Sequence, residues 1–278
     1  MKVLDRMSAT LKAGFGMTLK KWKELLVGFG KVYGSVVAFF LVGFVVMILL
    51  AMLSEILILL GLILMIPVSI IAGGIALSSN TLVDNVADEK EFELIETIKK
   101  DWIRNSVFVI MMGLFWVALS IPGMIGEFVG GIAGLLLILI GWLIYLAWIF
   151  IVQFVQWEYV VGRKGIVESI KGSYSAVMKN FGFVLGMDIV VGMLMAIILA
   201  VFYITAIIIV TMFALAAVFG STPSIGGGDV SDIFPLFGIW AVVGFFVSAL
   251  LAIGISITID VLFKPVSYFT WKEATKNK

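Results

Sequence analysis

The chain has 278 residues, of which 62% are hydrophobic, and its mean hydropathy is +1.20. An ordinary soluble domain is about 45–50% apolar, so this composition excludes that class; the net charge of +1, with no concentrated basic face, also argues against a nucleic-acid partner. Because the chain contains neither cysteine nor histidine, it lacks disulfides, the commonest metal ligand and the commonest general base, and we expect no cofactor and no enzymatic activity.

Six apolar runs are long enough to cross a bilayer, because about 20 helical residues span its hydrocarbon core. They cover residues 32–53, 56–78, 106–125, 129–152, 183–220 and about 236–263. The first two runs are predicted to form a hairpin that turns at Glu55, and the next two a hairpin that turns at Gly126 and Glu127. The fifth run is longer than one crossing requires, so it projects beyond the membrane, kinks or folds along the outer surface.

The basic residues are sorted by side. All 19 Lys and Arg residues fall before the first run, between the second and third, between the fourth and fifth, or after the sixth. The other three connections carry only the acids Glu55, Glu127, Asp229 and Asp232. Cationic loops remain cytoplasmic during insertion, and a Lys or Arg at the centre of a spanning helix costs about 2.5–3.5 kcal/mol. We therefore predict an all-α, six-helix protein of the cell membrane with both termini in the cytoplasm.

The cytoplasmic segments contain an internal repeat. Residues 11–22 match residues 170–181 without gaps, each apolar, small, aromatic and basic position being answered in kind. A shortened version occurs at 96–105. Because each copy precedes a pair of apolar runs, we predict a single integral membrane domain, 1–278, of three units, each an amphipathic interfacial helix followed by a helical hairpin. The units cover about 1–80, 81–156 and 157–278.

These repeated segments are predicted to lie at the lipid headgroups. Apolar residues recur at helical spacing in each segment, with lysines among them, which is typical of a helix that lies flat in the interface. Tryptophans at the same boundary are expected to form an aromatic belt. The candidate headgroup contacts are Lys12, Lys20, Lys171, Lys179, Trp22, Trp102, Trp157 and Trp271.

Two carboxylates lie inside the apolar runs. Asp188 is about five residues into the fifth run, and Asp260 is near the end of the sixth, four residues before Lys264. An intramembrane carboxylate suggests a proton or cation site. The alternative is that both lie near the cytoplasmic interface, with Asp260 and Lys264 forming an ordinary helical pair, and their shallow depth favours it.

Two further patterns concern contacts. Gly126, Gly130 and Gly134 recur at four-residue spacing, which favours close helix packing within the chain. The segment 84–96 carries six carboxylates and is expected to be a solvated helix face, with docking of a basic partner as the alternative.

The stretch from Phe154 to Phe181 resembles a six-helix membrane family that includes the membrane domain fused to some glycerophosphodiester phosphodiesterases and stand-alone bacterial and archaeal proteins. The residues that carry the likeness are Glu158, Gly165, Ile166, Ser169, Ile170, Lys171, Tyr174, Lys179, Asn180 and Phe181. The resemblance implies the architecture only. In the fused proteins the hydrolase activity belongs to a separate soluble domain, so no catalytic residue is carried over.

Two functions are compatible with these features. The leading interpretation is a non-enzymatic integral membrane protein that acts through membrane lipids or through a protein partner at the cytoplasmic face. The alternative is a small-solute transporter or channel, which the repeat, Pro67, Pro122 and Asp188 favour. A water-filled cavity with a polar lining that reaches the middle of the membrane would favour the second interpretation.

Overall fold

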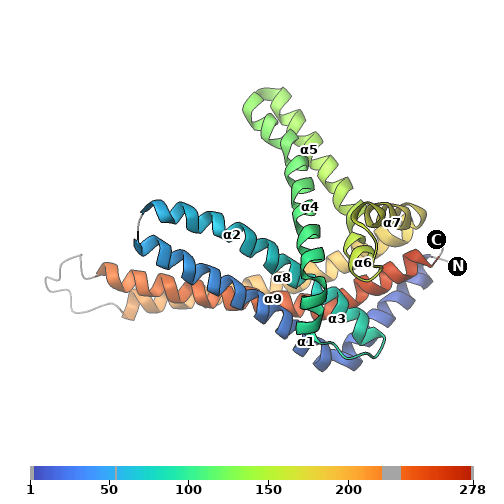
Figure 1. Cartoon of the computed structure of the whole chain (residues 1–278), viewed down its shortest axis with the longest axis horizontal. Coiled ribbons are helices and arrows are strands. Elements are labelled where there is room, and N and C mark those ends of the chain that lie inside the picture. The colour runs from blue at the N-terminus through green and yellow to red at the C-terminus, as the bar shows by residue number, and fades with distance from the viewer. Residues whose placement is uncertain (1–2, 54, 221–232, 277–278) are drawn as a thin grey trace. The chain divides into compact units, whose positions relative to one another are not determined.

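The computed structural model describes residues 3–53, 55–220 and 233–276, and its regular elements are helices throughout (Figure 1). They are α1 (Val3–Leu53), α2 (Glu55–Ala76), α3 (Ser78–Ala87), α4 (Leu94–Val129), α5 (Gly131–Val152), α6 (Val155–Val160), α7 (Ile166–Lys179), α8 (Phe181–Gly220) and α9 (Ile233–Thr275). Six helices in the described part of the chain are long and apolar enough to cross a membrane, which agrees with the six runs predicted. The chain is thus compatible with a multi-pass membrane protein.

The contacts divide the chain into two compact units. One consists of Met1–Gly186 together with Val261–Lys278, and the other is Met187–Asp260. Every contact discussed below lies within the first unit. The predicted outer connection that carries Asp229 and Asp232 lies outside the described residues.

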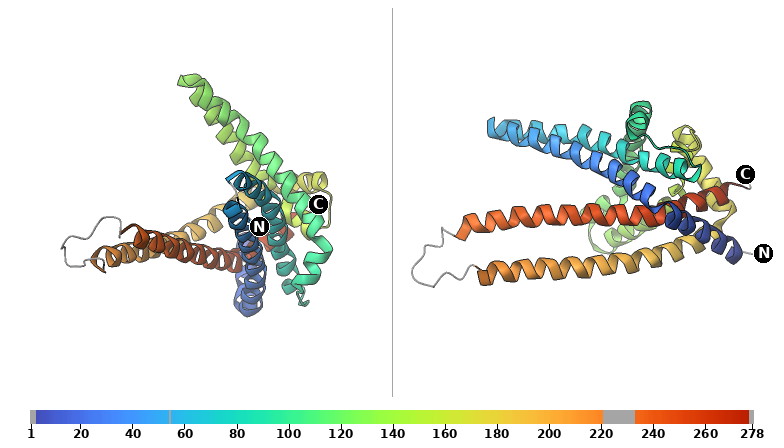
Figure 2. Two further views of the ribbon diagram at one scale, coloured as in Figure 1. Left: turned by 60° about the vertical axis from the view of Figure 1, so that its left-hand side comes forward. Right: turned by 90° about the horizontal axis from the view of Figure 1, so that it is seen from below.

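Both predicted hairpins are present in the first unit. Helix α1 packs beside α2, and α4 packs beside α5 (Figures 1 and 2). The second turn differs from the prediction, because α4 continues through Gly126 and Glu127 to Val129. The chain reverses at Gly130 and Gly131, whose φ angles of +64° and +58° favour glycine. Glu127 is therefore an exposed helical residue rather than a turn residue.

Gly126 allows the two helices of this hairpin to approach closely. A Cβ atom at Gly126 would lie 2.7 Å from the carbonyl oxygen of Gly134, so neither position has room for a side chain. This confirms that these two glycines pack within the chain, whereas Gly130 serves the turn. Small residues are what brings membrane helices together, since lipid offers no hydrophobic drive for their association.

The backbone leaves helical geometry at matching positions of the predicted repeat. Within α1 the break is at Lys21 (φ −113°, ψ 18°), and between α7 and α8 it is at Asn180 (φ −123°, ψ 30°). Lys21 and Asn180 occupy the same position when 11–22 is aligned with 170–181. In each case the break divides an amphipathic segment from the long apolar helix that follows.

The fifth apolar run forms one continuous 40-residue helix, α8. Helices α2 and α4 likewise continue through Pro67 and Pro122. The buried core of the first unit includes a cluster of Leu77, Phe108, Val155, Tyr159 and Val160. This cluster joins α4 to α6, and α6 and the loop after it also make polar contacts with α4.

Candidate functional site

A buried carboxylate stands at the centre of these contacts. Glu158 of α6 is 1% exposed, and Lys164, in the loop before α7, donates to its Oε2 atom. Burying a carboxylate without a cation would cost several kcal/mol, so the local fold depends on the pairing of Glu158 with Lys164. Helix α7 also packs directly on this carboxyl group, because a Cβ atom at Gly172 would lie 3.0 Å from the Glu158 Cδ atom. A side chain at position 172 would therefore press on the Glu158 carboxyl group where α7 crosses α6.

Arg104 links α4 to the loop between α6 and α7 by hydrogen bonds. Its Nη2 atom donates to the carbonyl oxygens of Tyr159 and, at 2.9 Å, of Lys164. The guanidinium lies 4.2 Å from the centre of the Tyr159 ring, and the Tyr159 hydroxyl donates back to the Arg104 carbonyl at 2.6 Å. Arg104 thus satisfies one backbone oxygen of α6 and one of the loop after it.

Two further residues of α4 extend the network. Asp101 is 4% exposed and pairs with Arg163 at 2.5 Å. Asn105 is 2% exposed and donates to the carbonyl oxygen of Gly74 at 3.2 Å, which ties α4 to the end of α2. We name this network the polar joint, and its members are Asp101, Arg104, Asn105, Glu158, Tyr159, Arg163 and Lys164.

A second network, the terminal joint, holds both ends of the chain. Asn180 donates to the carbonyl oxygen of Ala274 at 2.9 Å and accepts from Arg6 at 3.1 Å. Arg6 also pairs with Glu273 at 3.2 Å and lies 4.5 Å from the centre of the Phe183 ring. The side chain of Asn180, where the helix is interrupted, is therefore hydrogen-bonded to both α1 and α9.

The acidic segment 84–96 contacts the C-terminal helix rather than only solvent. The Tyr268 hydroxyl donates to Asp84 at 2.6 Å, and Lys272 lies 3.8 Å from Asp88. Lys90 donates to Asp88 at 2.8 Å, and this hydrogen bond is the main reason that the pKa of Asp88 falls below its usual value. The basic partner considered for this segment is thus in part the chain's own α9.

The two amphipathic segments match in which aligned positions are buried and in which positions expose large apolar side chains. In α1, Gly14, Met17 and Thr18 are buried, and at the aligned positions of α7 so are Ser173, Ala176 and Val177. The exposed residues are, in the same alignment, Leu19 (77%) with Met178 (51%) and Trp22 (49%) with Phe181 (49%). A water-soluble helix would bury the large apolar side chains. The arrangement suits surroundings that are themselves apolar.

The predicted headgroup residues divide into two groups. Lys12, Lys20, Lys171 and Lys179 are exposed, as are Trp22 and Trp102. Trp157 and Trp271 are 3% and 8% exposed, and their rings stack on each other with centres 6.3 Å apart.

The expectation that Trp157 and Trp271 contact lipid is therefore wrong within this fold. Trp157 belongs to the short helix α6, which turns inward, and its Nε1 atom donates to Ser267 of α9 at 3.1 Å. No periodicity in the sequence marks that change of direction.

Asp188 and Asp260 both lie in the second unit, and both are partly exposed. The hypothesis that they form a proton or cation site stays a prediction. Within the described ranges, no group of three or more acidic side chains is placed to hold a metal ion.

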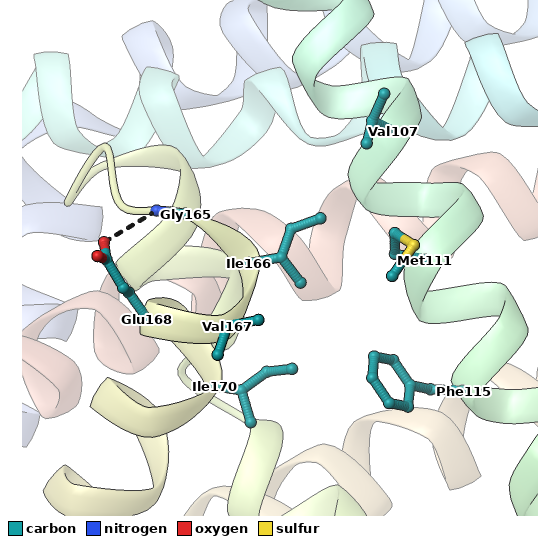
Figure 3. A pocket seen from close by; sticks show the side chains of 8 residues that line it. All are labelled: Val107, Met111, Phe115, Gly165, Ile166, Val167, Glu168 and Ile170. Carbon is teal, nitrogen blue, oxygen red and sulfur yellow. Dashed lines mark hydrogen bonds between the residues drawn. The ribbon is translucent and has the colours of Figure 1, made fainter.

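Two pockets adjoin the polar joint. One is polar, has a volume of about 330 Å³ and is lined by residues that include Glu91, Glu96, Lys100 and Arg163. The other has a volume of about 510 Å³ and lies between α4 and the start of α7 (Figure 3). Its side chains are almost all apolar.

No protein-family model, curated protein or solved structure matches this chain. The site therefore has to be interpreted from its own geometry.

Proposed function

We propose that the chain is a non-enzymatic integral membrane protein that acts through membrane lipids on its cytoplasmic side. Both termini would lie in the cytoplasm, and the two joints would hold three repeated units at the lipid headgroups. The six-helix family described above remains the proposed family. A protein partner on the same face is the other class of partner that these surfaces suit.

One observation carries the proposal: the exposed face of each amphipathic segment combines large apolar side chains with lysines. Leu19 and Trp22 lie beside the exposed Lys20 in α1, and Met178 and Phe181 lie beside the exposed Lys179 in the α7 segment. Apolar side chains inserted below the headgroups and cations level with the phosphates are the two contributions to interfacial binding.

The polar joint supports a structural rather than a catalytic interpretation of its charged residues. Asp101 and Glu158 are each buried and paired with a cation, and Arg104 is taken up by two carbonyl oxygens. Such pairs fix the position of α7 relative to α4, and with it the direction in which the apolar face points.

The test is to neutralise three exposed lysines together, Lys12, Lys171 and Lys179, by substitution with glutamine. The protein is purified from membranes that contain phosphatidylglycerol and phosphatidylcholine, and the retained lipids are counted. We expect phosphatidylglycerol to fall several-fold relative to phosphatidylcholine, because each cation near an anionic surface contributes about 1 kcal/mol.

The matched control removes the same charge elsewhere, from Lys90, Lys276 and Lys278. We expect this variant to retain lipid as the unaltered protein does. Unchanged lipid and unchanged co-purifying proteins in the first variant would overturn the proposal.

A further inference from the structure

The apolar groove between α4 and α7 has two facing walls. Val107, Met111 and Phe115 form one wall at four-residue spacing, and Ile166, Val167 and Ile170 form the other (Figure 3). Eight residues separate Val107 from Phe115, so the α4 wall is about 12 Å long. It follows one face of a helix that is apolar and long enough to cross a membrane.

The groove offers a polar ligand almost nothing. Its polar groups are the backbone N–H of Gly165 and the carboxylate of Glu168, and they are hydrogen-bonded to each other at 3.4 Å across the first turn of α7 (Figure 3). Val107 and Val167 are 45% and 64% exposed. Apolar surface of this extent is stabilised when a hydrocarbon covers it. The volume of about 510 Å³ lies within the range of small-ligand sites.

Cationic groups adjoin the groove. Lys171 directly follows Ile170, is exposed, and has no ion-pair partner among the described residues. Lys100 lies seven residues before Val107, which places both on one face of α4, and together with Arg163 it lines the neighbouring polar pocket. Four carboxylates line the same pocket, those of Glu91, Glu93, Glu96 and Asp101, so an anionic group is better placed at Lys171 than in that pocket. A ligand with an apolar chain and an anionic group beside it would match the apolar groove and the neighbouring lysine.

We propose that the groove between α4 and α7 binds a hydrocarbon chain of one membrane phospholipid, with the lipid's phosphate at Lys171. This inference rests on the proposed function and deepens it by naming the site and the class of ligand. The phosphate is the anionic group that every phospholipid supplies. The polar joint links α4 to the loop before α7 and so holds the two walls of the groove at a fixed separation.

The experiment compares Val107→Phe, which narrows the groove, with Val117→Phe. Val117 is 63% exposed on the same helix and lines no part of the groove. Each protein is purified, mixed with phosphatidylglycerol in detergent, and examined by native mass spectrometry. We expect Val107→Phe to hold one phosphatidylglycerol fewer per chain, and Val117→Phe to hold as many as the unaltered protein.

Two further variants keep the result interpretable. Ile170→Phe narrows the groove from the opposite wall and is expected to lose the same lipid. A loss in both variants would show that the effect does not come from a folding defect in α4. Lys171→Gln is expected to weaken binding about fivefold and to leave the groove open. Gel filtration and thermal unfolding establish that each variant is folded.

Equal lipid counts in Val107→Phe, Ile170→Phe and Val117→Phe would overturn the proposal, as would an equal loss in all three. If the groove variants retain lipid while neutralised Lys12, Lys171 and Lys179 release it, the groove is wrong and the proposed function stands. If the lysine variant also retains its lipid, the proposed function fails with it.

Discussion

The polar joint and the α4–α5 hairpin are held together by opposite means, although α4 takes part in both. In the joint, buried charges such as Glu158 and Asp101 are paired one by one. In the hairpin, close approach occurs at Gly126 and Gly134, while large side chains such as Phe128 (89% exposed) face outward. The close approach in the hairpin therefore depends on two small residues, whereas the joint depends on specific pairs of charged and polar groups.

The largest effect is expected from Lys164→Ala, which leaves the Glu158 carboxylate buried without its cation. We expect the free energy of unfolding to fall by about 2–4 kcal/mol, less than for a fully buried pair because Lys164 is 40% exposed. Thermal and denaturant unfolding in detergent measure the loss. The matched control is Lys171→Ala, an exposed lysine that has no ion-pair partner in the described part of the chain.

The double variant Glu158→Gln with Lys164→Ala sharpens this result. It removes the buried charge as well as the cation, so we expect it to be more stable than Lys164→Ala alone. If Lys164→Ala were no less stable than Lys171→Ala, the joint would not depend on this pair.

An intermediate effect is expected where the hairpin is closest. Gly126→Ala brings a Cβ atom within 2.7 Å of the Gly134 carbonyl oxygen, so we expect it to destabilise the protein by about 1–3 kcal/mol. Gly123→Ala on the same helix meets nothing within 4 Å and should be neutral or stabilising, since alanine favours helix. Equal stabilities of the two variants would show that α4 and α5 are not packed at Gly126.

The smallest effect concerns the exposed Asp88. Lys90 and Lys272 hold the pKa of Asp88 below its usual value of 3.8, so its carboxylate stabilises the fold above that pH and the contribution is lost as the pH falls through the lowered pKa. Compared with Asp88→Asn, the unaltered protein should unfold at a slightly higher temperature at pH 7. The difference in the free energy of unfolding should stay within about 1 kcal/mol, because exposed pairs contribute little, and should shrink as the pH falls through the lowered pKa.

A difference that persists undiminished at pH 2 would contradict that origin. Added salt should also reduce the difference at pH 7, since exposed charges are screened.

The sequence was sufficient to predict those features that depend on residues close together in the chain, namely the helices and their close packing at small residues. Apolar run length gave six helices, and the small residues at 126 and 134 gave the packing of the second hairpin. The alignment of 11–22 with 170–181 also coincides with the two backbone breaks at Lys21 and Asn180. These follow from helix geometry and from neighbours a few residues apart.

The contacts of the joints could not be predicted in this way. Arg104 and Lys164 are 60 residues apart, and Arg6 and Asn180 are 174 apart, so their meeting depends on how whole helices pack. Trp157 has the position of a belt residue, yet α6 turns it toward Ser267 of α9. The turn at Gly130 rather than Gly126 was missed because glycine suits both a close helix contact and a left-handed turn.

If every cationic connection lies on one side of the membrane, single cysteines can report it directly, because the chain contains no cysteine. Intact cells that express Lys90→Cys or Asp229→Cys are treated with a membrane-impermeant maleimide. We expect Asp229→Cys to be labelled at once and Lys90→Cys to be labelled only after the membrane is permeabilised. Labelling of Lys90→Cys in intact cells would contradict this expectation.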